Sequence, residues 1–132
     1  MSRTRYAWVR AWATLALVLV AAACDGGGNG LGGPPSITAG VQVSWTANRE
    51  AAVNRAGGGY RVYHGRTSGF DLATASFIDV PYNSGATAPT STSLLLSSGD
   101  NFIKVVAYSA LNPNGSAPSG EITVSVPFAA AP

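Results

Sequence analysis

Apolar and polar residues alternate in short runs over residues 36–127, as expected for strands that bury one face. The run VQVSW places Val41, Val43 and Trp45 on one side, because successive side chains of a strand point in opposite directions. Later runs predict further inward-facing residues: Ile78 and Val80, then Ile103, Val105 and Ala107, then Ile122, Val124 and Val126.

The run GYRVYHG predicts a second strand with two different faces. Tyr60, Val62 and His64 share one side, and Arg61 and Tyr63 share the other. We expect the first group to face the core and the second to face solvent.

One further strand is expected within TSTSLLLSS, residues 90–98, but its register stays open. The consecutive leucines Leu94, Leu95 and Leu96 do not show which side is buried. No segment after residue 36 has a helical period, and the runs are separated by turn-forming glycine, proline, asparagine and aspartate residues. A chain of 132 residues has room for one domain, so the pattern predicts a single all-β domain.

Five segments follow one another along the chain: Trp45 ending V-x-V-x-W, Y-R-V-Y-x-G at 60–65, I-x-V-x-A at 103–107, S-x-P-S at 116–119 and I-x-V-x-V at 122–126. Their order resembles the fibronectin type III family, over roughly residues 35–127. That family has an immunoglobulin-like, seven-stranded, two-sheet sandwich, and the resemblance implies the same fold here. It also implies that Trp45 and Tyr60 pack in the shared core, to which the alternating pattern adds Val62, Ile103 and Val105.

The chain departs from the family at the position of its corner tyrosine, which falls at Asn101. The hydrogen bond of that tyrosine is therefore expected to be absent or replaced. The alternation turns Phe102 toward solvent. The alternative is that Phe102 shifts inward to fill the space of the missing tyrosine.

Residues 1–23 have the three parts of an export signal. A basic segment through Arg10 is followed by 13 apolar or small residues, Ala11–Ala23. A membrane-spanning helix needs about 20 residues, so the length favours a cleaved signal peptide. The run LVAAAC resembles the lipobox of bacterial lipoproteins, which implies acylation of Cys24. The alternative is an ordinary signal peptide followed by an unmodified cysteine.

Residues 24–35 are rich in glycine and proline and predict a flexible tether. The expected organisation is then a signal peptide at 1–23, the lipidated Cys24 and tether at 24–35, the domain at 36–127 and a short tail at 128–132. Two or three acyl chains anchor a protein stably. The protein is therefore expected to be exported and held on the cell membrane or outer membrane, facing the periplasm or the cell exterior.

The net charge and the cysteine count exclude some classes of function and structure. After cleavage before Cys24, five Lys and Arg residues remain against six Asp and Glu, a net charge of −1. This balance gives no electrostatic footprint for nucleic acid. The single cysteine excludes an internal disulfide.

No group of residues has the pattern of a catalytic or metal site. His64 is the only histidine, and the alternating pattern predicts that it lies at the edge of the core. Asp71, Asp79 and Asp100 lack the spacing of a calcium loop. We expect no enzymatic activity, no cofactor and no metal.

The outer face of the predicted sheet carries the candidate binding residues Arg61, Tyr63, Phe102 and Lys104. Tyrosine and arginine dominate binding hot spots. The expected function is a lipid-anchored, non-catalytic envelope module that binds or adheres to a protein or a polysaccharide. The alternative is a structural or accessory subunit of a larger envelope or extracellular assembly, with no ligand of its own.

Overall fold

A computed structural model describes residues 33–130 of the chain. The predicted signal peptide, Cys24 and most of the predicted tether lie outside the described residues, as do residues 131 and 132. Within residues 33–130 there is no helix, and so no apolar helix long enough to cross a membrane.

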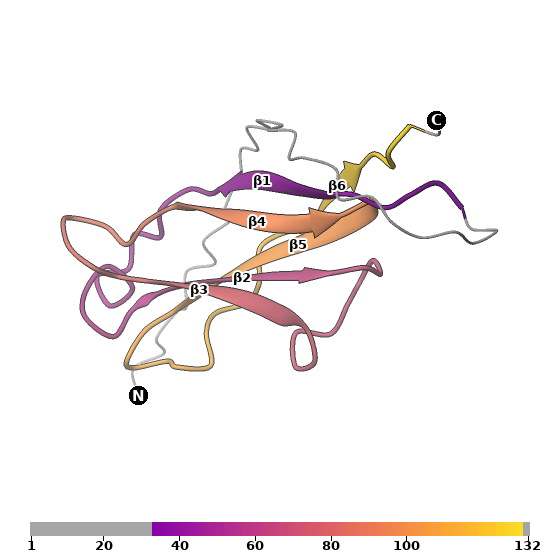
Figure 1. Ribbon diagram of the computed structural model, residues 1–132. Helices are drawn as coiled ribbons and strands as arrows, with labels where there is room; N and C mark the ends of the chain where they lie inside the picture. The colour runs from indigo at the N-terminus through magenta and orange to yellow at the C-terminus, as the bar shows by residue number, and fades with distance from the viewer. Residues whose placement is uncertain (1–32, 131–132) are drawn as a thin grey trace.

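Six strands form the regular structure of the described residues. They follow the alternating runs of the sequence, and Figure 1 shows their arrangement. Their bounds are β1 Thr38–Ser44, β2 Gly59–Gly65, β3 Ser76–Pro81, β4 Ser91–Ser97, β5 Gly99–Tyr108 and β6 Ile122–Val126. The all-β prediction is confirmed.

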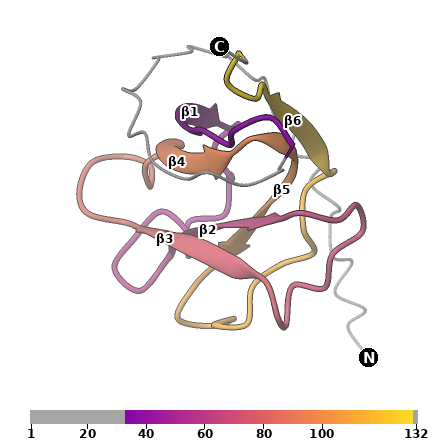
Figure 2. The ribbon, with the colours of Figure 1, turned by 45° about the vertical axis from the view of Figure 1, so that its right-hand side comes forward.

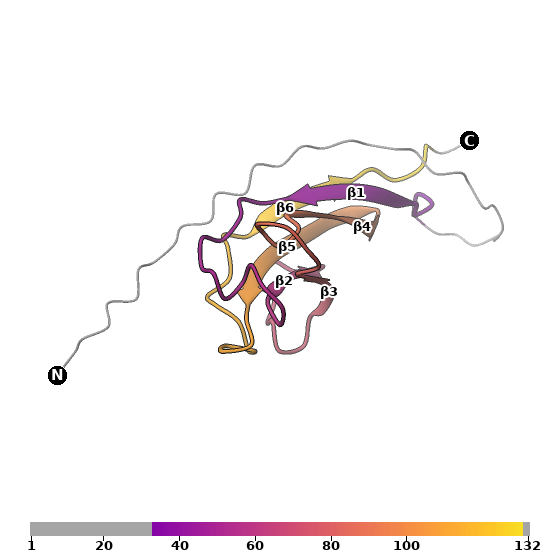
Figure 3. The same cartoon turned by 90° about the vertical axis from the view of Figure 1, so that its left-hand side faces the viewer.

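The strands form two antiparallel sheets. One sheet contains β1 and β4, and the other has the order β3-β2-β5-β6. The turned views show β1 and β4 on one side of the domain, with β2 and β3 on the other (Figures 2 and 3). Strands β2 and β5 are therefore central, while β3 and β6 are the edges of the larger sheet.

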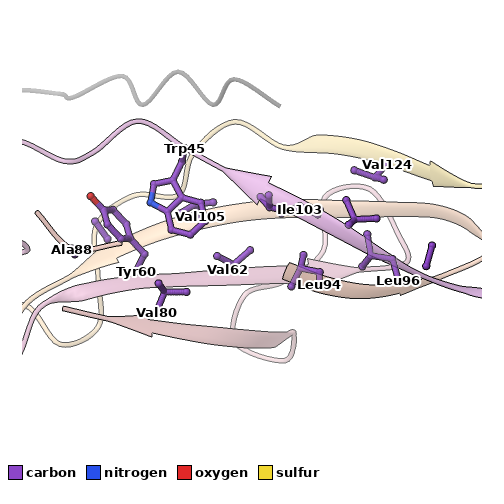
Figure 4. Packing of buried hydrophobic residues seen from close by; sticks show 14 of the residues in the cluster. Trp45, Tyr60, Val62, Val80, Ala88, Leu94, Leu96, Ile103, Val105 and Val124 are labelled. Atoms are coloured by element: carbon purple, nitrogen blue, oxygen red, sulfur yellow. The ribbon is translucent and has the colours of Figure 1, made fainter. Parts of the chain in front are cut away.

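The core lies between the two sheets and draws residues from all six strands. Figure 4 shows Trp45 and Tyr60 together at one end of this core and Leu96 and Val124 toward the other. The ring centroids of Trp45 and Tyr60 are 5.2 Å apart in an edge-to-face arrangement, a favourable geometry for aromatic pairs. The five predicted core residues are all buried: Trp45, Tyr60, Val62, Ile103 and Val105.

The pairing of β4 with β1 settles the register of the three leucines. Leu94 lies opposite Val41, and both Leu94 and Leu96 are only 1% exposed. Leu95 points away from the core and is 77% exposed.

Six strands are described where the family resemblance implies seven. Residues 33–37 precede β1 without joining a ladder. Two of them, Pro34 and Pro35, have no N–H group to donate. The carbonyl of Pro35 instead accepts a hydrogen bond from Ala129 N at 3.0 Å, so the beginning and the end of the domain lie side by side.

Candidate functional site

The outer face of the four-stranded sheet gathers the four residues expected there. In the pairing of β2 with β5, Tyr63 lies opposite Lys104 and Arg61 lies two residues along the same side of β2. Phe102 lies opposite Gly65 at the other end of the ladder. The structure therefore places Arg61, Tyr63, Phe102 and Lys104 on one face, and we call this surface the outer face.

Tyr63 was expected to face solvent, but it is buried. Its side chain is only 8% exposed, because a residue of the neighbouring strand covers it. Phe77 of β3 lies opposite Tyr63 in the ladder, with the two ring centroids 5.1 Å apart. The exposed aromatic of this pair is Phe77, at 48%.

Arg61 lies between two aromatic rings. Its guanidinium carbon is 5.6 Å from the centroid of Phe77 and 4.5 Å from that of Tyr108. Such contacts attract the cation to the negative face of each ring. Arg61 Nη1 also donates to the carbonyl of Pro113 at 2.9 Å, which ties the loop between β5 and β6 to the outer face.

That loop packs directly on the sheet beside Arg61. Val106 of β5 is on the outer face but only 2% exposed. A Cβ added at Gly115 would come within 2.4 Å of Val106 Cγ1, and Gly115 has a φ of 91°. Only glycine allows this close approach and this backbone conformation, so the loop is seated in a defined position.

Tyr108 completes this part of the face as a neutral hydrogen-bonding group. Burial and the hydrogen bond with Asp79 raise the pKa of Tyr108 to about 12, against an opposing effect of Arg61. The phenol is therefore protonated at neutral pH. The outer face therefore brings together the Phe77 and Tyr108 rings, the Arg61 guanidinium and the Asp79 carboxylate.

Lys104 belongs to a second cluster on the same face. Its Nζ lies 4.6 Å from the centroid of Phe70 and 3.3 Å from Glu121 Oε2. Glu121 also accepts hydrogen bonds from Ser68 Oγ at 2.7 Å and Gly69 N at 2.9 Å. The Ser68 and Gly69 hydrogen bonds, more than Lys104, hold the pKa of Glu121 below its usual value.

Asn101, the position where the resemblance implies a corner tyrosine, is buried and makes its own set of hydrogen bonds. Asn101 is 3% exposed, and its Nδ2 donates to the carbonyls of Ser97 and Gly99 at 3.0 Å. Its Oδ1 accepts from Arg66 Nη1 at 2.8 Å. Because Asn101 occupies the inward position, Phe102 stays half-buried on the outer side, and the alternative of an inward shift of Phe102 is not observed.

His64 lies away from the outer face, in an open cleft of about 360 Å³. Arg66, Ser76 and Leu96 also line this cleft. Among the described residues, His64 makes no hydrogen bond with a serine or a carboxylate, and no three His, Cys, Asp or Glu side chains are grouped as metal ligands.

Sequence reasoning missed four members of the outer face: Phe70, Phe77, Tyr108 and Glu121. For two of them, the alternation of side chains along a strand could have predicted a place on the outer face. Tyr108 continues the side of β5 that holds Phe102 and Lys104, and Phe77 alternates with the inward-facing Ile78. Phe70 and Glu121 lie outside the strands, where no alternation could place them.

Searches against protein-family profiles, curated proteins and solved structures find no match to this chain.

Proposed function

We propose that this protein is a lipid-anchored, non-catalytic binding module of the cell envelope, with a fibronectin type III-like sandwich that carries its binding surface. The observation that carries the proposal is the outer face. There, a 48% exposed Phe77 lies beside a guanidinium that is already held between two aromatic rings.

The outer face suits recognition because its groups are ordered before any partner arrives. Arg61 is held by Tyr108 and Pro113, and Lys104 by Phe70 and Glu121. A partner that binds there does not have to immobilise long, flexible side chains, which costs about 0.5–1.5 kcal/mol for each side chain. The ring of Phe77 offers apolar area for a protein side chain or for the flat side of a sugar.

Two features support the proposed fibronectin type III-like fold. Trp45 and Tyr60 pack against each other in the shared core, as the family resemblance implies. The strand order β3-β2-β5-β6 opposite β1-β4 is compatible with the family's sandwich, with one of the seven strands absent from the described residues.

The anchor is supported by the sequence alone. Cys24 follows three alanines and an apolar run of 13 residues, Ala11–Ala23, that is too short to span a membrane. Acylation there would leave the domain on a tether with an r.m.s. reach of roughly 18 Å.

Partner retention by outer-face variants tests the function. The full-length protein, extracted from membranes in detergent, is passed over immobilised cell-wall polysaccharide and, separately, cross-linked to neighbouring proteins in intact cells. We expect Phe77→Ala to lower the retained or cross-linked fraction at least tenfold, because it removes the exposed ring but leaves the core intact.

The matched control is Leu95→Ala, which removes an apolar side chain, 77% exposed, from the opposite sheet. It should bind as the wild type does. Equal binding by all three proteins would show that the outer face is not the contact surface. If the wild-type protein is not retained on the polysaccharide and cross-links to no neighbouring protein, the proposed binding function is wrong.

A further inference from the structure

Strand β3 presents an open edge with hydrogen-bonding groups that no described residue uses. The bond from Tyr82 N to Gly58 O, 2.8 Å long, continues the register of β3 with β2. In an antiparallel ladder, hydrogen-bonded and non-hydrogen-bonded pairs alternate, so the even-numbered residues of β3 bond to β2. The odd-numbered residues Phe77 and Asp79 therefore direct their backbone N–H and C=O groups outward, away from β2.

The edge carries two apolar side chains, Phe77 and Ile78, beside the exposed Ser76, Asp79 and Pro81. Phe77 is 48% exposed, and Ile78 is a partly buried residue that packs against the core from the rim. The opposite edge strand, β6, carries exposed Thr123 and Ser125 instead. Natural edge strands avoid exposed apolar groups because such edges pair with other chains.

We propose that two copies of this chain associate through β3, pairing their edges antiparallel about a two-fold axis at Ile78. Phe77 of each copy then lies opposite Asp79 of the other. The outward backbone groups of these two residues complete four hydrogen bonds. At the axis, Ile78 meets Ile78 in a non-hydrogen-bonded pair, in which side chains lie closest, and both become more buried.

The geometry of the domain favours a second copy as the occupant of this edge. The two-fold axis is perpendicular to the extended sheet, so both outer faces point to the same side. The chain enters the domain at residues 33–37, next to β1, in the other layer (Figure 3). Both tethers can thus reach one membrane beneath the pair while both outer faces point away from it.

This arrangement rests on the proposed lipid anchor at Cys24. The ladder between copies is short, because Pro81 has no N–H group and ends it. Such an interface is weak in solution. Confinement of both copies to one membrane raises their effective concentration, and dimerisation joins two outer faces into one bivalent surface.

Site-specific disulfide formation tests the dimer and its register. The full-length Ile78→Cys protein is oxidised in the membranes of expressing cells and run on a non-reducing gel. Cα atoms of a non-hydrogen-bonded pair lie about 4.5 Å apart, within the range that a disulfide spans. We expect a cross-linked dimer at least five times as abundant as for Asp79→Cys, because the two Asp79 positions lie diagonally, roughly 8 Å apart.

A second pair of variants isolates the backbone contact. In the Ile78→Cys protein, Asp79→Pro removes an outward N–H group, whereas Asp79→Ala keeps it and loses the same carboxylate. We expect the proline variant to lose the cross-link and the alanine variant to retain it, with equal protease resistance showing that both are folded.

Equal cross-linking of Ile78→Cys and Asp79→Cys would overturn the dimer, as would a cross-link that survives Asp79→Pro. The failure of the anchor has a different signature. A wild-type chain that cross-links through an unacylated Cys24 would contradict lipidation, whereas loss of the Ile78→Cys dimer alone leaves the anchor and the outer face intact.

Discussion

Asn101 is a buried amide whose hydrogen bonds connect three segments of the domain. Its side-chain amide donates to Ser97, Gly99 and Val124 carbonyls and accepts from Arg66. These bonds join the turn between β4 and β5 to β6 and to the end of β2. Net hydrogen bonds contribute about 0.5–1.5 kcal/mol each and cost more when a buried partner is left unpaired. A buried amide can therefore hold this corner without an aromatic ring.

Trp45 is the largest side chain of the core, and its removal should be the most damaging single truncation. The ring is 6% exposed and packs on Tyr60. We expect Trp45→Ala to lower the free energy of unfolding by about 3–5 kcal/mol, through lost transfer energy and the cavity left behind. Urea denaturation followed by far-UV circular dichroism measures this.

Trp45→Phe is the control for the indole. Trp45 Nε1 is buried without a hydrogen-bond partner, so phenylalanine removes an unsatisfied donor and keeps most of the apolar area. It should be clearly milder than alanine. A loss below about 1 kcal/mol for Trp45→Ala would contradict the core position of the ring.

At the scale of elements, strand β4 has a sequence with no usable alternation, and its partner strand decides its orientation. Leu94, Leu95 and Leu96 are chemically alike, so each register buries at least one leucine. The alternating strand β1 pairs with β4 through a fixed register that sets Leu94 opposite Val41. A slip by one residue would expose Leu94 and Leu96 and bury only Leu95, which makes the observed register the more stable one.

We therefore expect substitution by alanine to have a large effect on stability at Leu96 and a small one at Leu95. Leu96→Ala should lower the free energy of unfolding by about 2–5 kcal/mol, because it opens a cavity in a fully buried position. Leu95→Ala should change it by less than about 0.5 kcal/mol, since the side chain is mostly in solvent. Thermal and urea unfolding of both proteins, side by side, measure the difference, and comparable losses would require another register for β4.

At the scale of the whole molecule, the domain brings its two ends together and sends three loops to the opposite end. Pro35 and Ala129 are hydrogen-bonded. Ser98 bonds to Ile37 and Pro127, and Arg66 bonds to Ser98, so the end of β2 and the start of β5 lie at this same end. The loops 45–58 and 82–90 and the turn at residues 109–115 lie at the other end (Figure 1). The proposed tether would join the domain beside residue 35, away from these loops and from the proposed binding surface.

The proposed lipid anchor at Cys24 is tested by replacing the cysteine sulfur. Cys24 is the only thiol of the chain, and acylation of a lipoprotein precedes its cleavage. We expect Cys24→Ser to abolish incorporation of labelled fatty acid and to leave an uncleaved precursor. Metabolic labelling measures the first effect, and gel mobility measures the second. Normal cleavage of the serine variant, together with an unlabelled wild-type protein, would contradict the lipoprotein assignment.

The sequence by itself determined which residues of the clearly alternating strands face inward, because burial of one strand face imposes a period of two on β1, β2, β5 and β6. Together with the family resemblance, which supplied the expected strand pairing, it placed Arg61, Tyr63, Phe102 and Lys104 on one common face. Which of them are accessible was decided only by the tertiary structure. Exposure depends on what the neighbouring strand contributes, and Phe77 of β3 covers Tyr63. The register of β4, the hydrogen bonds of Asn101 and the loop seated by Arg61 are likewise contacts between segments distant in the chain, and no local pattern encodes such contacts.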